Sequence, residues 1–330
     1  MFLTALALAL PAQTPATGET IPLSLKRHRA WAIELPDERF VPVGDGLELA
    51  GRTFAAARQG SGLALDLDAD GQTDVEITGD EGAALLRTAD GFAYPVRLKR
   101  GTNGWFYATG GAMVGKRGNT RISILDQDGD GRYGEVGQDA VIVGRGGVAA
   151  TLGETLVVDE ELFRVAVTSA GDALQLTPYE GATGMIEVAD AFEGEGRVLS
   201  AVVQSADGTH VLDLGEARGP VPVPVGAWHL QSAKVGLGSM AVAVDRGFSK
   251  DMEVTSGEST TLAWGGPVRA EFAFQRQGAK VGFSPDAIWY YGEHGERYAT
   301  WFPVGDSPVF HLQDAETGEE YARAMFPGSG

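Results

Sequence analysis

The stretch RISILDQDGDGRYGEVGQDAVIV, Arg121 to Val143, places two short apolar segments on either side of a turn rich in aspartate and glycine. The flanking segments, RISIL and AVIV, carry the alternating or β-branched residues that favour strands. The Asp-Gly pairs between them are residues that tight turns prefer. The stretch therefore predicts two strands joined by an acidic loop.

The same pattern recurs along the rest of the chain. Short segments with a period of two, such as TDVEIT, LFRVAV, THVLDL and MAVAV, are separated by breaks that contain Gly, Asp or Pro. No segment sustains an apolar stripe of helical period over three turns. The best helical candidates are Ala50–Arg58 and, more weakly, Asp80–Arg87. We therefore predict an all-β fold made of several antiparallel β-sandwich-like modules, with little helix.

The overall composition limits the kind of protein this can be. A length of 330 residues, 43% of them hydrophobic, is enough for two or three packed domains. Forty-five acidic residues against 26 basic ones give a net charge of −19, which argues against nucleic acid as a partner. The absence of cysteine excludes disulfides and thiolate metal sites. Stability must therefore come from core size or from bound ions.

The N-terminus predicts export. Phe2 to Leu10 is an apolar run, followed by Pro11 and small residues that suit cleavage. No Lys or Arg precedes this run, so a buried first strand is the alternative interpretation. We expect residues 1–18 to be a signal peptide and the protein to be secreted, periplasmic or on the cell surface. No later segment has the ~18 uninterrupted apolar residues of a transmembrane helix.

Three further units are predicted behind the signal peptide. Residues 19–159 contain both acidic turns and form an N-terminal β domain. Residues 160–266 carry closely spaced strands and form a middle β-sandwich module. The tetrapeptide WGGP ends this module, because Pro267 cannot donate a hydrogen bond to a central strand. Residues 267–330 are then expected to be an immunoglobulin-like β-sandwich.

The two acidic turns share one spacing of carboxylates. DLDADGQTD begins at Asp66 and DQDGDGRYGE begins at Asp126, and each has carboxylates at positions one, three and five and glycine at position six. Calcium takes about six to eight hard oxygen ligands, and the glycine permits the sharp bend that gathers them. The predicted calcium ligands are Asp66, Asp68, Asp70, Gln72 and Asp74 in the first loop and Asp126, Asp128, Asp130, Arg132, Glu135 and Asp139 in the second.

These loops differ from helical EF-hands in how they close. An EF-hand places a bidentate Glu at position twelve, on the exiting helix, whereas Ile77 and Gly137 stand there in this chain. Asp74 is the nearest closing carboxylate in the first loop, and Glu135 or Asp139 in the second. Gln72 and Arg132 would contribute only a backbone carbonyl. Two solvated Asp-Gly turns without an ion are the alternative.

DLDADGQTDVEI resembles the calcium turns of FG-GAP and VCBS-type repeats, in which an acidic turn joins two strands. The resemblance implies that the side chains at positions one, three, five and nine bind the ion, here Asp66, Asp68, Asp70 and Asp74. The second loop departs from this pattern at position nine, where it has Gly134, so that Glu135 is the substitute. The chain thus resembles modular β-sandwich proteins that bacteria secrete.

A second resemblance concerns the middle module. PVPVPVGAWHL, Pro220 to Leu230, is similar to a strand of carboxypeptidase regulatory-like domains. This resemblance implies a non-catalytic accessory β-sandwich.

Three other features offer weaker candidate sites. Gly144, Gly146 and Gly147 superficially match a dinucleotide fingerprint, but the helix that such a site needs is missing from the pattern. His294 lies between two glutamates in YGEHGERY, where a metal site would need further ligands. The C-terminal aromatic residues could stack on sugars or pack in a core, and we favour the core. They are Trp289, Tyr290, Tyr291, Tyr298, Trp301 and Phe302.

From these features we expect an exported, calcium-stabilised protein with a non-catalytic binding or structural role. Its expected partner is a carbohydrate or a cell-surface protein. The alternative is a carboxylate-based hydrolase such as a glycoside hydrolase, whose two acids stand ~5–10 Å apart across a sugar cleft. The acids of this chain crowd into polar turns instead, which favours the binding role.

Overall fold

The structure is a computed structural model that describes residues 18–28, 30–278, 280–299 and 309–325. The described residues form strands and turns without a helix, which confirms the predicted all-β class. Nearly all strand pairings are antiparallel, and the pairing of β18 (Thr183–Glu187) with β25 (Ser259–Thr261) is parallel. Among the described residues there is no helix with the length and apolar character needed to span a bilayer.

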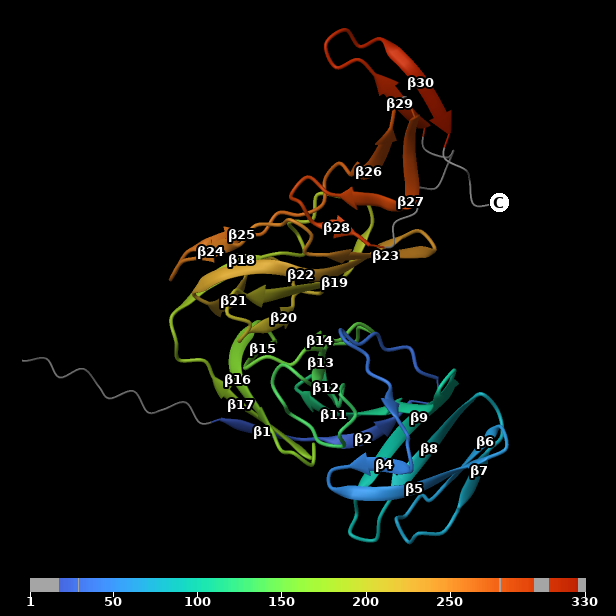
Figure 1. Ribbon diagram of the computed structural model, residues 1–330. Coiled ribbons are helices and arrows are strands. Elements are labelled where there is room, and N and C mark those ends of the chain that lie inside the picture. The colour runs from blue at the N-terminus through green and yellow to red at the C-terminus, as the bar shows by residue number, and fades with distance from the viewer. Residues whose placement is uncertain (1–17, 29, 279, 300–308, 326–330) are drawn as a thin grey trace, which may run out of the picture.

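The first unit, blue to green in Figure 1, is built from four small sheets around one core. Their strand orders are β14-β13-β12-β11-β2, β3-β10-β9-β8, β4-β5-β6-β7 and β1-β17-β16-β15. The strands are β1 (Glu19–Pro22), β2 (Ser24–Arg27), β3 (Val41–Pro42), β4 (Gly46–Leu49), β5 (Arg52–Gln59), β6 (Gly62–Leu65), β7 (Val75–Ile77), β8 (Glu81–Arg87), β9 (Ala93–Gly101), β10 (Gly104–Thr109), β11 (Gly111–Arg117), β12 (Thr120–Leu125), β13 (Ala140–Val143), β14 (Ala150–Thr151), β15 (Thr155–Val158), β16 (Glu161–Val167) and β17 (Ala173–Pro178).

The second unit lies above the first in Figure 1 and is coloured yellow to orange. Its main sheet has the order β20-β19-β22-β23-β28-β27-β26, with β24 also paired to β22, and a smaller sheet has the order β21-β18-β25. Beyond β18 and β25, the strands are β19 (Arg197–Ser205), β20 (Val211–Asp213), β21 (Val221–Pro224), β22 (Gly226–Leu237), β23 (Met240–Asp245), β24 (Met252–Val254), β26 (Arg269–Gln277), β27 (Lys280–Tyr291) and β28 (Arg297–Tyr298).

Two tryptophans organise the core of the second unit. Trp228 and Trp264 are both buried within it. The indole of Trp228 donates to the carbonyl of Pro224 at 2.9 Å, so the PVPVPVGAWHL segment turns back on itself between β21 and β22. The indole of Trp264 donates to the carbonyl of Val188, also at 2.9 Å. A separate hairpin of β29 (Val309–Gln313) and β30 (Glu320–Met325) lies at the end farthest from the first unit (Figure 1).

Both helical candidates are wrong. Ala50–Arg58 and Asp80–Arg87 form strands β5 and β8 instead. Ala50 and Gly51 both have positive φ, +50° and +77°, and make the two-residue turn between β4 and β5 that a hairpin requires. In β8 the buried Ala84 and Leu86 alternate with more exposed residues, which is the period of a strand. Pairing with neighbouring strands therefore overrides the helix preference of the alanines.

Strand pairing runs across both predicted domain boundaries, which stay predictions. The hairpin of β15 and β16 turns at residues 159 and 160, and β1 pairs with β17. At the other boundary, β28 pairs with β23, so residues after 267 extend the main sheet of the middle module. Of the predicted signal peptide, only Gly18 lies within the described residues.

Candidate metal centre

The second acidic loop begins where β12 ends and is built into the core of the first unit. Its first residue, Asp126, is 0% exposed. Asp126, Asp128 and Asp130 each offer a carboxylate oxygen, and these three oxygens all lie within 4.8 Å of one another. Alternate residues of one turn therefore aim their oxygens at a common centre, which is the arrangement that a hard cation needs.

Hydrogen bonds fix the orientation of the buried Asp126 carboxylate. The hydroxyl of Tyr94 on β9 donates to its Oδ2 at 2.8 Å. The backbone N–H groups of Gly129 and Gly131 donate to its two oxygens, each at 2.7 Å. Tyr107 on β10 supports the same turn, because its hydroxyl donates to the carbonyl of Gly129 at 3.2 Å. The loop is thus anchored from two strands of a neighbouring sheet.

Asp139 closes the loop from its far end, at the start of β13. It is 1% exposed, and its two oxygens accept hydrogen bonds from the N–H of Gln127 at 3.3 Å and of Glu135 at 2.9 Å. Glu135 itself accepts a hydrogen bond from the Gln138 amide at 3.3 Å. Neither acid belongs to the three-residue group, and Asp139 braces the loop through its two backbone donors.

The remaining predicted residue of this loop, Arg132, is exposed. Its Nε lies 3.8 Å from Oδ2 of Asp130, and its backbone N–H donates to Oδ1 of the same residue at 2.7 Å. The guanidinium therefore lies on the outside of the turn and leaves the interior to the carboxylates.

The buried acids of the second loop have strongly perturbed protonation. Burial raises the pKa of Asp126 well above its usual range, and the nearby Asp139 raises it further, against the opposing effect of the Tyr94 hydroxyl. Burial likewise raises the pKa of Asp139 to about 7, with Asp128 adding to the rise. Burial also raises the pKa of Tyr133, whose hydroxyl has no hydrogen-bond partner among the described residues. These raised pKa values mean that burial disfavours the charged form of both carboxylates unless a cation compensates for it.

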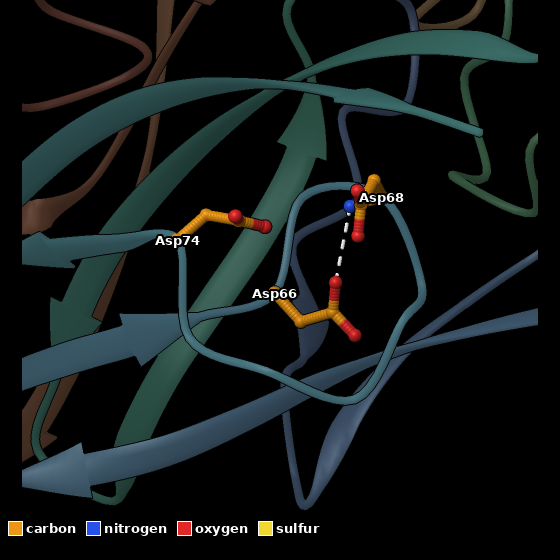
Figure 2. A group of neighbouring side chains, drawn as sticks. All are labelled: Asp66, Asp68 and Asp74. Atoms are coloured by element: carbon orange, nitrogen blue, oxygen red, sulfur yellow. Dashed lines mark hydrogen bonds between the residues drawn. The ribbon is translucent and has the colours of Figure 1, made fainter. Parts of the chain in front are cut away.

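The first acidic loop joins β6 to β7 at the surface. Figure 2 shows the carboxylates of Asp66, Asp68 and Asp74, and one oxygen of each lies within 4.8 Å of the others. Asp66 is 2% exposed, whereas Asp68 and Asp74 face solvent. Oδ2 of Asp74 accepts a hydrogen bond from the N–H of Leu67 at 2.7 Å, which closes the loop.

Asp70 and Gln72 do not join this group. The carboxylate of Asp70 accepts hydrogen bonds from the backbone N–H of Gln72 at 2.7 Å and from its side-chain amide at 3.1 Å. These two predicted residues therefore pair with each other at the loop's outer edge. The structure brings together three of the predicted residues in each loop, and the remaining ones surround them.

Both loops have the same backbone conformation at positions four and six. Gly129 and Gly131 have φ of +76° and +84°, and Ala69 and Gly71 have φ of +65° and +85°. Burial would raise the pKa of Asp66, but the N–H groups of Gly71, Asp68 and Ala69 outweigh that effect and lower it. The loops are two copies of one turn, the second buried and the first exposed.

Sequence reasoning missed the two tyrosines that hold the second loop. Tyr94 lies in β9 and Tyr107 in β10, and no spacing in the sequence relates either residue to the acidic turn. The pairing of β9 with β10 and the packing of that sheet against the loop bring their hydroxyls to it.

The three weaker candidate sites are the glycines near position 144, His294 and the C-terminal aromatic residues. Strands β14 and β15 follow the glycines at 144–147, with no helix between them. His294 contacts Glu193 at 3.3 Å across the exposed surface and belongs to no metal-ligating group of the described residues. Tyr291 and Tyr298 are buried, while Trp289 is 37% exposed. Trp301 and Phe302 lie outside the described residues.

Fold and loops together define a class: an all-β protein with two acidic turns of EF-hand-like spacing carried between strands. No protein-family model matches the chain, and no curated protein and no solved structure shows significant similarity to it.

Proposed function

We propose that this is an exported, calcium-stabilised, non-catalytic protein with a binding or structural role at the cell surface or outside the cell. One observation carries the calcium part: Asp126 is fully buried, yet Asp128 and Asp130 place further carboxylate oxygens within 4.8 Å of its own. At that separation two like charges repel by about 3 kcal/mol in a medium of effective dielectric about 20. A bound divalent cation reverses this repulsion.

The chemistry of the donors favours calcium over other cations. The side chains gathered in each loop supply only carboxylate oxygens, with no histidine or cysteine. Hard oxygen ligands suit calcium or magnesium rather than zinc or copper. Asp126, Asp128 and Asp130 would hold the ion in the second loop, and Asp66, Asp68 and Asp74 in the first. Calcium tolerates irregular coordination, which suits turns that contribute both side chains and carbonyls.

The geometry of the acids supports a binding or structural role over hydrolysis. A glycosidase separates its two carboxyl groups by ~5–10 Å across a sugar cleft. The gathered oxygens here lie within 4.8 Å of one another inside closed turns. The apolar N-terminal run supports export, and the absence of cysteine leaves ion binding as a way to stabilise such a chain.

Thermal unfolding of the full chain with calcium and with chelator tests the proposal. Calcium at a hundredfold excess over its dissociation constant should add about 2.7 kcal/mol of stability, because the ion binds the native state. Asp128→Asn should remove most of this gain and Asp68→Asn a smaller part, since the second loop is the more buried. Asp207→Asn alters an exposed Asp-Gly turn at 207–208 and should leave the gain unchanged. Coincident melting curves with and without calcium would refute the calcium sites.

A further inference from the structure

A groove lies between the two units, and its lining includes no residue of either acidic loop. Its volume is about 1080 Å³, slightly above the ~300–1,000 Å³ typical of small-molecule sites. The first unit contributes residues 145–148, between β13 and β14, and two residues of the 30s segment. The second unit contributes eight residues between 189 and 199, three between 215 and 218, and one residue each of β22 and β23.

Basic side chains gather in this groove although the molecule is strongly acidic. Arg145, Arg197 and Arg218 line it, and their guanidinium groups form no ion pair or hydrogen bond with other described residues. All three are exposed. Arginines elsewhere in the described residues, such as Arg117 and Arg297, do form ion pairs with carboxylates. Three that remain unpaired around one concave surface mark it as a site for an anion.

The acidic residues of the groove contact groups other than the three arginines. Glu34 forms an ion pair with Lys234, which ties the two units together. Oδ2 of Asp190 accepts a hydrogen bond from the N–H of Gly219 at 2.9 Å. The third acid, Glu216, lies against Gly144. The lining thus carries four basic and three acidic side chains, with the three arginines available to a ligand.

Glycine backbone forms much of the remaining wall. Gly146 has no atom within 4 Å of the position that a Cβ would occupy, so its peptide groups are open to the groove. Gly147, Gly194, Gly196 and Gly215 also line it. Bare peptide groups offer donors and acceptors to hydroxyl-bearing ligands. The ring of Phe192, packed 4.5 Å from that of Trp264, supplies an apolar surface beside them.

We propose that this groove binds a short carboxylate-bearing oligosaccharide, such as an oligomer of uronic acid units. Guanidinium groups bind carboxylates through two parallel hydrogen bonds. Peptide groups and one aromatic ring suit the hydroxyls and the apolar face of a sugar. The nearly balanced lining charge on an acidic molecule disfavours densely charged polymers such as nucleic acid. The inference rests on the binding role proposed above and gives it a site and a ligand class.

Calorimetric titration of the full chain with a short oligoglucuronate tests the site. We expect saturable binding that weakens as salt rises, because ion pairs at an open groove are screened. Arg197→Gln and Arg145→Gln should each lower the affinity by about tenfold, the loss of roughly one charge-assisted contact. Arg197→Lys keeps the charge but loses the planar fork, and should restore only part of the affinity. Arg87 on β8 is exposed, lies outside the groove and has no ion pair or hydrogen bond to its guanidinium among the described residues, so Arg87→Gln should leave the affinity unchanged.

Three results would overturn the proposal. They are absence of binding at millimolar oligoglucuronate, equal binding of the uncharged oligoglucoside, and an equal effect of Arg87→Gln. Tighter binding of an oligoglutamate peptide than of the sugar would assign the groove to acidic peptides instead. The outcome is independent of the calcium test. A calcium-dependent melting shift without oligosaccharide binding refutes only the proposal that the groove binds an oligosaccharide.

Discussion

Ala69 and Gly129 occupy the same position in the two acidic loops, with φ of +65° and +76°. A left-handed conformation costs a residue with a Cβ about 1–2 kcal/mol, whereas glycine adopts it freely. Ala69→Gly should therefore raise the free energy of unfolding by about 0.5–1 kcal/mol in urea denaturation, after the larger entropy of the unfolded glycine is subtracted.

The same substitution in an extended strand provides the control. Ala57 is exposed in the middle of β5, where glycine is unfavourable, so Ala57→Gly should lower stability by about 0.5–1 kcal/mol. If both variants change stability with the same sign, the left-handed conformation of Ala69 does not strain the loop.

Glu296 is a buried acid away from the acidic loops. It is 0% exposed, and its Oε1 accepts a hydrogen bond from the N–H of Gly265 at 2.7 Å, while its other oxygen has no partner among the described residues. Burial raises the pKa of Glu296, against smaller opposing effects of backbone donors and His294. The folded state therefore holds this proton more tightly than the unfolded state.

Stability should accordingly fall as pH rises from about 4.5, the ordinary value for glutamate, through the raised pKa of Glu296. Glu296→Gln should remove this fall in stability. The variant should therefore exceed the wild type in stability most clearly at pH values above the raised pKa of Glu296. Urea unfolding across this pH range at constant calcium measures the effect. The neighbouring Glu293 is exposed, and Glu293→Gln should keep the wild-type slope. If stability depends on pH in Glu296→Gln as it does in the wild type, the pH dependence does not come from Glu296.

At the scale of elements, strands β9 and β10 support the second loop through one hydroxyl each. Tyr94 donates to the Asp126 carboxylate, which bound calcium would keep charged, and Tyr107 donates to the carbonyl groups of Gly129 and Glu48. Hydrogen bonds to charged groups contribute about 1.5–3 kcal/mol and neutral ones about 0.5–1.5. In the presence of calcium, Tyr94→Phe should therefore cost more stability than Tyr107→Phe in chemical denaturation. The reverse order would mean that the carbonyls, rather than the carboxylate, anchor the loop.

At the scale of the whole molecule, the two units meet where the β14–β15 connection packs on β20. A Cβ at Gly153 would lie 2.6 Å from the backbone N of Val211, and the N–H of Glu154 donates to the carbonyl of Thr209 at 3.0 Å. A small apolar cluster of Ala150, Val202 and Val211 spans the same contact. The close backbone approach couples the two cores.

Gly153→Ala should push the units apart at a cost of about 1–3 kcal/mol, the usual effect of overpacking. Scanning calorimetry should then show the two cores melting in separated transitions. Gly146→Ala, also between the units but with open space at its Cβ, should keep the wild-type profile. A single transition at the wild-type temperature in Gly153→Ala would show that this contact does not couple the units.

Local pattern sufficed to predict the fold class and the two loops. Period-two alternation is a property of adjacent residues, and the spacing of Asp126, Asp128 and Asp130 predicted that alternate side chains of one turn converge. The same spacing did not suffice for Asp70 in the first loop, where Asp74 joins Asp66 and Asp68 instead. The helix predicted for Ala50–Arg58 does not form. The helix preference of its alanines is weak, and the hairpin turn at Ala50 and Gly51 pairs the segment as a strand instead.

Only the tertiary structure decided which loop is buried, since Asp66 and Asp126 head nearly identical motifs. Burial depends on which strands pack over the turn, and Tyr94 reaches Asp126 across 32 positions of the chain. The groove that gathers Arg145, Arg197 and Arg218 likewise exists because two units meet. Residues far apart in sequence become neighbours through packing, and no local pattern records that proximity.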